Sequence, residues 1–222
     1  MVWTLPNILT VSRIALTPVV ALLPFINGYL PKLIAFVVFV IAAISDLIDG
    51  HLARQRDEVT DLGKLLDPIA DKLLLFAALI PIFAITRSSM SQYGIPWWGN
   101  LPLIVLLLLV GREIAMTVFR HVAKGRGVVI AADSAGKIKT VVQNIFLGAT
   151  IAWFAWRDMR VQFGWETGWL GDLWNRVHGA VVAVTLGGAL VLTVFSLLNY
   201  FYRYRNLFRS TSAVSPKSGH GA

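Results

Sequence analysis

Four aspartates are the residues of this sequence whose type and spacing are best suited to chemistry. Asp46 and Asp49 are three positions apart, and Asp67 and Asp71 are four positions apart. Either spacing places both carboxylates of a pair on one face of a helix. Carboxylates gathered in an apolar setting repel one another, so they either take up protons or bind cations. All-carboxylate sites favour hard divalent cations such as Mg²⁺ or Mn²⁺.

The number of carboxylates predicts two such ions, because four negative charges offset two divalent cations. Two divalent ions about 3.5–4 Å apart commonly clamp a phosphoryl group during its transfer. The neighbouring residues suit a phosphate ligand: Gly50 and Ala53 leave room beside the helix, and Arg54 offers a fork of donors to a diphosphate. Gly63 relieves crowding where the next helix begins. An ion or proton pathway would explain the acidic residues but not the neighbouring glycine, alanine and arginine residues.

The elements that carry these residues are membrane-spanning helices. The chain of 222 residues is 56% hydrophobic and only 14% charged, and it contains no cysteine for disulfide or thiolate chemistry. A spanning helix needs about 20 mainly apolar residues. The hydropathy pattern therefore predicts an all-α integral membrane protein, a bundle of six transmembrane helices. Their predicted ranges are 7–28, 32–53, 63–86, 98–121, 137–156 and 178–202.

The connections between these helices predict the orientation of the chain. With the N-terminus inside, the inner segments hold 14 Lys and Arg residues and the outer segments hold 5. The positive-inside rule then places both termini and the four aspartates on the cytoplasmic side of the inner (cytoplasmic) membrane, in a multi-pass protein. The net charge of +8 follows from this basic rim, which suits anionic lipids rather than nucleic acid.

The remaining segments carry no predicted chemistry. Asp57, Glu58 and Asp61 lie in the middle of the connection between the second and third helices, and we interpret them as a solvated loop. The tryptophan-rich segment 157–176 is expected to be an interfacial loop on the outer side. Residues 1–208 are predicted to form the transmembrane catalytic domain, and the small polar residues of 209–222 a disordered tail.

Basic residues near the same membrane face form a second candidate site. Arg112 lies within an apolar run beside Glu113, and Lys137 and Lys139 stand where the fifth helix begins. A buried arginine needs a partner, and the sequence is compatible with two kinds of partner for Arg112. One is a structural pair of Arg112 with Glu113 or an aspartate. The other is a bound anion at a helix N-terminus, although positive-inside anchoring accounts for one of the two lysines.

At this point the residues resemble a known family, the CDP-alcohol phosphotransferases. The matching stretch reads Asp46-x2-Asp49-Gly50-x2-Ala53-Arg54-x8-Gly63-x3-Asp67-x3-Asp71. Every fixed position and gap of the family signature is filled, so the resemblance is specific. It implies a six-helix membrane enzyme that transfers a substituted phosphoryl group from a CDP-linked donor to an alcohol and releases CMP.

The resemblance also implies roles for the residues. The four aspartates would hold two Mg²⁺ or Mn²⁺ ions, and Asp71 would also take the proton of the acceptor hydroxyl. The CDP site would be formed by Gly50, Ala53, Arg54 and Gly63. Members of the family are often homodimers, which leaves a homodimer open for this chain.

Three further patterns are similar to those of the bacterial phosphatidylglycerophosphate synthases within the family. These patterns are Pro6-Asn7-x-Leu9-Thr10-x2-Arg13, Gly111-Arg112-Glu113 and Gly136-Lys137-x-Lys139-Thr140-x2-Gln143. They imply CDP-diacylglycerol as donor and sn-glycerol 3-phosphate as acceptor, with its phosphate bound by Arg112, Lys137 and Lys139. Inositol phosphate or serine as acceptor stays an alternative. A membrane prenyltransferase and an ion carrier are more remote ones.

Overall fold

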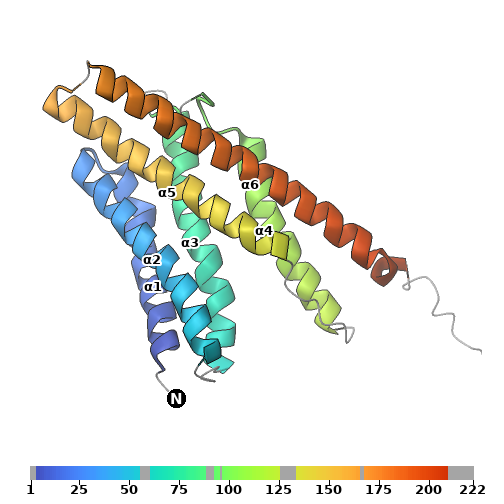
Figure 1. Ribbon diagram of the computed structural model, residues 1–222. Coiled ribbons are helices and arrows are strands. Elements are labelled where there is room, and N and C mark those ends of the chain that lie inside the picture. The colour runs from blue at the N-terminus through green and yellow to red at the C-terminus, as the bar shows by residue number, and fades with distance from the viewer. Residues whose placement is uncertain are drawn as a thin grey trace, which may run out of the picture.

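The computed structural model describes residues 4–55, 61–88, 93–95, 97–125, 134–165 and 168–209, with the side chains of Pro6, 47–55, 61, 62, 64, 65, 134, 135, 137, 170, 201 and 203–209 excepted. The described part consists of helices, joined by short connections (Figure 1). These are α1 (Leu5–Leu22), η1 (Leu23–Phe25), α2 (Tyr29–Gln55), α3 (Asp61–Arg87), α4 (Leu103–Gly125), α5 (Ser134–Phe163) and α6 (Trp169–Arg209). Its one β-type contact is an isolated bridge between Ile95 and Gly99.

The six predicted helices are confirmed, and α2 and α3 continue into the acidic stretch as expected. Each has 27 residues, which corresponds to a length of about 40 Å at 1.5 Å per residue. The hydrocarbon core of a bilayer is about 30 Å thick, so both helices are longer than an untilted span requires. Asp61 was expected in the loop, but it is the first residue of α3.

The prediction of an interfacial loop over 157–176 is wrong for most of that segment. Helix α5 continues to Phe163 and α6 begins at Trp169, so only a short connection remains. Hydropathy marks the part of a helix that lies in lipid, whereas the helical backbone hydrogen bonds continue beyond it. Trp156 of α5 and Trp174 of α6 pack together with their ring centroids 5.3 Å apart, which stabilises the two extensions against each other.

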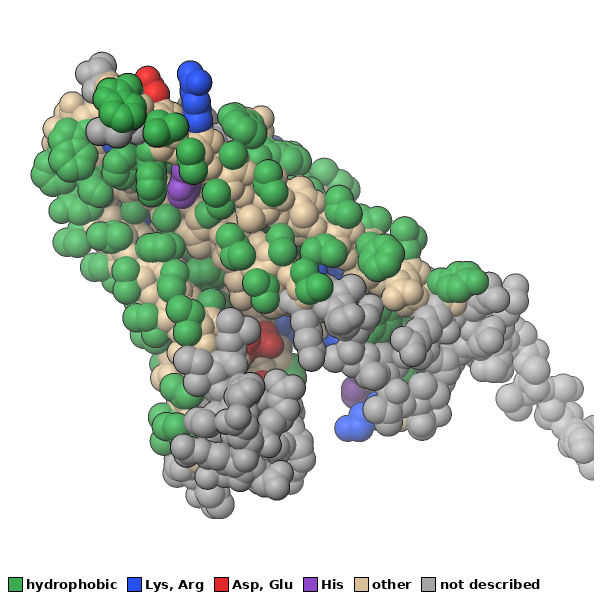
Figure 2. Space-filling model, viewed as in Figure 1, with side chains coloured by type: hydrophobic (Ala, Val, Ile, Leu, Met, Phe, Trp, Pro, Cys, Tyr) green, Lys and Arg blue, Asp and Glu red, His purple; other side chains and the backbone are tan. Residues whose placement is uncertain are grey.

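The helices form a multi-pass membrane protein. Five of the six are long and apolar enough to cross a membrane. The exception is α4, whose apolar sequence is interrupted by Arg112 and Glu113. The outward faces are apolar: Val184 and Val191 on α6 are 71% and 68% exposed, and the space-filling view is dominated by hydrophobic side chains (Figure 2). Such surfaces suit lipid contact.

The packing places polar clusters at both ends of a central apolar core. Helix α1 packs against α2 and α3, α2 against α5, α5 against α6, and α6 against α4. Buried residues of the core include Phe39 of α2, Leu79 of α3, and Phe146 and Phe154 of α5. Lys32 and Asp46 lie on α2 on either side of this core. Asp46 is 14 positions after Lys32, which is about 21 Å along the helix.

Candidate active site

The predicted acidic cluster lies where α1, α2 and α3 meet, and it contains an arginine at its centre. Nη1 of Arg13 donates to Oδ1 of Asp46 at 2.6 Å and to Oδ1 of Asp71 at 3.0 Å. The side chain of Arg13 is 1% exposed, whereas that of Asp71 is 53% exposed. The carboxylates of α2 and α3 therefore converge, as their positions on two consecutive helices predict, and they do so on a guanidinium from a third helix.

Asp67 has a separate partner on α1. Oγ1 of Thr10 donates to Oδ1 of Asp67 at 2.8 Å. Buried polar residues recur every three or four positions along this helix: Asn7, Thr10, Arg13 and Thr17. The sequence alone assigns no chemical role to Thr10 or Arg13: both belong to a pattern of resemblance, and Arg13 also counts as one of the inner positive residues. The signal for them is this helical spacing of polar residues within an otherwise apolar helix. We call Arg13, Asp46, Asp67 and Asp71 the Arg13 cluster.

The other residues of the acidic signature are placed by their backbone. Asp49, Gly50, Ala53 and Arg54 are helical within α2, and their side chains lie outside the part that the structure describes. Gly63 is buried near the start of α3, as expected for a residue that relieves crowding there because it has no side chain. The helical backbone keeps Asp49 one turn from Asp46, on the face that the spacing predicts. The roles of these five residues stay predictions.

The basic residues of α4 and α5 also come together. Nη1 of Arg112 donates to Oε1 of Glu113 at 2.8 Å, and its Nη2 donates to Oγ of Ser196 on α6 at 2.9 Å. Nζ of Lys139 donates to the same Oε1 of Glu113. The structural pair of Arg112 with Glu113 is thus present. We call Arg112, Glu113, Lys139 and Ser196 the basic cluster. It holds two cations and one carboxylate, and the side chain of Lys137 lies outside the described part.

A cavity of about 90 Å³ connects the two clusters. Asp46 and Asp71 line one side of it, and Glu113 and Lys139 line the other. The sequence does not single out Lys72 and Asn144, which also line it. The other lining residues are Leu74, Leu75, Thr140 and Gln143. Figure 2 shows acidic atoms inside a recess at this end of the molecule. We call the side with Asp46 and Asp71, which also carries Lys72, the acidic wall, and the side with Lys139 and Glu113 of the basic cluster the basic wall.

The donor set of the acidic wall suits a divalent cation. The carboxylates of Asp46 and Asp71 contact a single arginine, and the carboxylate of Asp67 is hydrogen-bonded to Thr10, so these three carboxylates outnumber the one guanidinium. Among the side chains that the structure describes, no group of three or more His, Asp or Glu residues is arranged to hold a metal ion. Asp49, the fourth predicted ligand, is not among those side chains. Oxygen ligands with excess negative charge are what Mg²⁺ and Mn²⁺ require, so these residues fit such ions.

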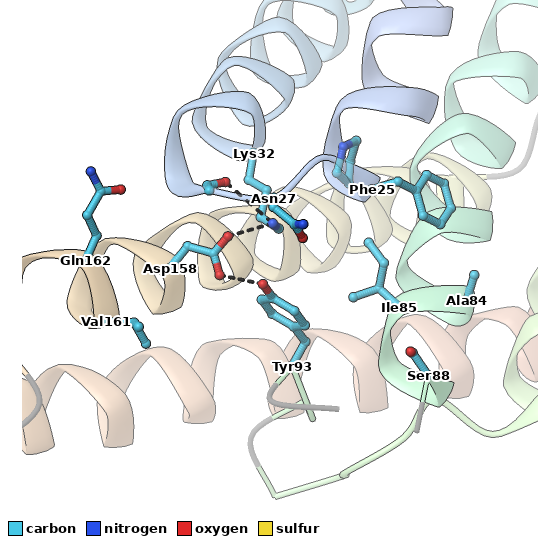
Figure 3. Close-up of a pocket in the computed structure, with 12 residues that line it drawn as sticks. Phe25, Asn27, Lys32, Ala84, Ile85, Ser88, Tyr93, Asp158, Val161 and Gln162 are labelled. Carbon is cyan, nitrogen blue, oxygen red and sulfur yellow. Dashed lines mark hydrogen bonds and ion pairs between the residues drawn. The ribbon is translucent and has the colours of Figure 1, made fainter. Parts of the chain in front are cut away.

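A second cavity, of about 690 Å³, lies at the opposite end of α2. Figure 3 shows Lys32 of α2 and Tyr93 both directed at Asp158 of α5. Nζ of Lys32 donates to Oδ2 of Asp158 at 2.6 Å and to the carbonyl of Ile26 at 3.0 Å, and the Tyr93 hydroxyl donates to Oδ1 at 2.5 Å. In this Lys32–Asp158 cluster one cation forms an ion pair with one carboxylate, so the charges of the pair balance.

Comparison with known proteins assigns the fold and the acidic signature to a family. The sequence profile of the CDP-alcohol phosphatidyltransferases matches residues 3–186, which is most of the chain. The chain belongs to this family. It is therefore a transferase, and the family match covers the whole of the Arg13 cluster and most of the bundle.

Curated relatives within the family are similar along much of their length. A CDP-diacylglycerol–glycerol-3-phosphate 3-phosphatidyltransferase of Bacillus subtilis is 37% identical over 161 residues, 67% of this chain and 77% of the relative. A probable phosphatidylglycerophosphate synthase of Mycobacterium tuberculosis is 34% identical over 90% of this chain and 80% of its own. A further 3-phosphatidyltransferase, from Salmonella typhimurium, is 31% identical over 90% of this chain and 94% of its own.

Proposed function

We propose that this CDP-alcohol phosphatidyltransferase transfers the phosphatidyl group of CDP-diacylglycerol to sn-glycerol 3-phosphate. The products are phosphatidylglycerophosphate and CMP. The observation that carries the proposal is the cavity with an acidic wall on one side and a basic wall on the other. An acidic wall suits metal-assisted phosphoryl transfer, and a basic wall suits an acceptor that bears a phosphate. The names of the relatives from Bacillus subtilis and Salmonella typhimurium specify the same donor and acceptor.

The acidic wall holds the metal ions in this proposal. Asp46, Asp49, Asp67 and Asp71 would bind two Mg²⁺ or Mn²⁺ ions, which supply positive charge to the diphosphate of the donor when bound. Thr10 fixes the carboxylate of Asp67 through its hydroxyl. This contact reduces the freedom of one ligand before the ions bind, and such orientation of ligands tunes metal sites.

Asp71 is the proposed base. It lines the cavity, and its side chain is the more exposed of the two aspartates that contact Arg13. The hydroxyl oxygen of the acceptor forms a bond to the phosphorus that carries diacylglycerol. The bond from that phosphorus to the CMP oxygen breaks, and the hydroxyl proton passes to Asp71. Base catalysis of this kind contributes about 10²–10⁴-fold to a rate.

The remaining signature residues form the proposed nucleotide site. Gly50 and Ala53 of α2 and Gly63 of α3 would leave space for CDP beside the helices, and Arg54 would contact the diphosphate. The basis for this assignment is the helical spacing of the signature, which places the glycine and the alanine within two turns of Asp46 and the arginine just beyond two turns. The acyl chains of the donor would stay in the bilayer beside the apolar helix faces.

The basic wall binds the phosphate of the acceptor in this proposal. Arg112 and Lys139 share the single carboxylate of Glu113, which leaves one positive charge in excess. Lys137, two residues before Lys139 on α5, would add another. Both clusters would face the cytoplasm, because the acidic ends of α2 and α3 lie on the side where Lys and Arg are concentrated.

An acceptor screen tests the proposal. Purified enzyme in detergent micelles is given CDP-diacylglycerol with Mn²⁺ and, separately, labelled glycerol 3-phosphate, inositol phosphate or serine. We expect CMP and a labelled lipid with glycerol 3-phosphate, and neither when divalent ions are chelated. A labelled lipid formed only from serine or inositol phosphate would contradict the assigned acceptor. Release of CMP in the presence of the chelator would contradict the metal site.

A further inference from the structure

Arg13 contacts the same carboxylates that the proposed function assigns to metal ions. One of its nitrogen atoms, Nη1, lies 2.6 Å from Oδ1 of Asp46 and 3.0 Å from Oδ1 of Asp71. A guanidinium nitrogen and a metal ion cannot both occupy the space between these two oxygens. Arg13 is therefore not simply a neighbour of the proposed metal site, because it already holds the position between two of its ligands.

Burial explains why the cation is needed there. The side chain of Arg13 is 1% exposed, and that of Asp46 is 30% exposed. Two carboxylates this close to each other repel strongly when neither water nor a cation separates them. A buried guanidinium is costly unless it is paired. Each side of this contact thus requires the other as long as no metal ion is bound.

Helix α1 keeps the guanidinium in place. Arg13 lies in the interior of α1, and its carbonyl accepts a hydrogen bond from the Thr17 hydroxyl at 2.9 Å. Thr10, one turn earlier, is bonded to Asp67. Helix α1 is thus fastened to the aspartates of α2 and α3 through the side chains of Thr10 and Arg13.

We infer that Arg13 is a built-in counter-cation, which occupies the cation position between Asp46 and Asp71 in the metal-free enzyme and competes with divalent ions for these two carboxylates. This inference rests on the two-metal site of the proposed function. Arg13 acts through the carboxylates and is a positioning residue. It keeps α1, α2 and α3 assembled when no ion is bound, and its contacts raise the metal concentration at which the site fills.

The alternative is an arginine that stays in place and supports the metal ligands. The two possibilities predict opposite effects of its removal. A supporting residue, once removed, weakens metal binding because the ligands lose their orientation. A competing cation, once removed, strengthens it because the ions no longer displace two charge-assisted hydrogen bonds.

The test is the equilibrium binding of Mn²⁺ alone, without substrates, to full-length protein in detergent, measured for wild type and for Arg13→Gln. We expect the dissociation constant of the variant to fall at least about tenfold, since each hydrogen bond to a charged group contributes enough for roughly that factor. The metal-free variant should also unfold at a lower temperature than metal-free wild type, and Mn²⁺ should raise its unfolding temperature by more.

Two further variants complete the test. Lys32→Gln removes the buried cation at the other end of α2 and should leave Mn²⁺ affinity unchanged. Arg13→Lys keeps the charge without the planar fork, so it should tighten binding in the same direction by a smaller factor. This second variant decides the matter if Arg13→Gln does not fold.

The outcomes separate the inference from the proposed function. Equal or weaker Mn²⁺ binding by the Arg13 variants, with clear binding by wild type, would overturn the role of Arg13 alone. Absence of Mn²⁺ binding from wild type and variants would overturn the proposed metal site, and the counter-cation with it. Binding by Arg13→Gln that exceeds binding by wild type supports both.

Discussion

The two ends of α2 carry buried ion pairs that differ in charge balance. At one end, the carboxylates of Asp46 and Asp71 contact the single guanidinium of Arg13, and the carboxylate of Asp67 is hydrogen-bonded to Thr10. At the other end, Lys32 faces the single carboxylate of Asp158 (Figure 3). The charges of a one-to-one ion pair neutralise each other, whereas a cluster with a net charge attracts ions of the opposite sign. We therefore assign chemistry to the first end and a structural role to the second.

The balanced end is connected to three parts of the chain. Lys32 lies at the start of α2, Asp158 lies in the last part of α5, and Tyr93 lies between α3 and α4. The Lys32 side chain is 3% exposed and that of Asp158 is 12% exposed. The cluster thus fixes the beginning of α2 against the end of α5, and with it the direction in which α2 carries Asp46 to the opposite end.

The largest expected effect is at the unbalanced end. Asp71→Asn removes the proposed base and one charge of the acidic wall, so turnover should fall on the order of 10²–10⁴-fold. CMP release measures turnover, and binding of labelled CDP-diacylglycerol in the same preparation should largely persist. Near-normal turnover of Asp71→Asn would remove it as the base and would weaken the distinction between the two ends.

The matching change at the balanced end should affect stability instead of chemistry. Asp158→Asn leaves buried Lys32 without its charged partner, which typically costs about 3–5 kcal/mol of folding free energy. Thermal or denaturant unfolding in detergent measures the loss, and Mn²⁺ affinity of the folded fraction should not change. Asp172→Asn, on the exposed first turn of α6, is the control and should alter stability by at most about 0.5 kcal/mol. Unchanged stability of Asp158→Asn would contradict the structural role.

A change in the basic wall should mainly affect the KM for the acceptor. Lys137→Ala removes a proposed contact to the phosphate of glycerol 3-phosphate, so the KM for this substrate should rise about tenfold or more. The KM for CDP-diacylglycerol should change far less. Steady-state kinetics with each substrate varied in turn measures both, with Lys124→Ala, an exposed lysine in the last turn of α4, as the control. Equal increases for donor and acceptor would indicate a structural lysine.

The smallest expected effect concerns Tyr93. Burial, followed by the hydrogen bond to Asp158, raises the pKa of the Tyr93 hydroxyl above its usual value. The protonated form is therefore the one that stabilises the fold, by about 1–2 kcal/mol. This contribution is present below pH values of about 10 and is lost as the pH rises through the folded-state pKa. Tyr93→Phe should lose it at neutral pH and show a weaker alkaline decline in unfolding temperature than wild type. Identical alkaline profiles would contradict the role of this hydroxyl.

The sequence predicts the helices and the convergence of the aspartates because both follow from local periodicity. Apolar windows identify the spans, and spacings of three and four residues define the helix faces. Consecutive helices then place Asp46 and Asp71 on the same side of the membrane. None of these steps requires knowledge of how distant helices pack.

The contacts that distinguish the two ends depend on that packing. Lys32 and Asp158 are 126 residues apart in the chain, and no local pattern pairs them. Arg13 counts in the sequence as one more inner positive residue, and only the packing of α1 against α2 and α3 shows that it bridges Asp46 and Asp71. The error over 157–176 has a related cause, because hydropathy reports contact with lipid and not the continuation of a helix supported by Trp156 and Trp174.

The central claim is that excess negative charge at one end of α2 makes a divalent metal site, and the most direct measurement is the number of Mn²⁺ ions bound per chain at equilibrium. We predict two ions for wild type and for Asp158→Asn, and a loss of binding when Asp46 and Asp67 are both changed to Asn. Binding that is absent from wild type, or that survives the Asp46 and Asp67 changes undiminished, would contradict the account.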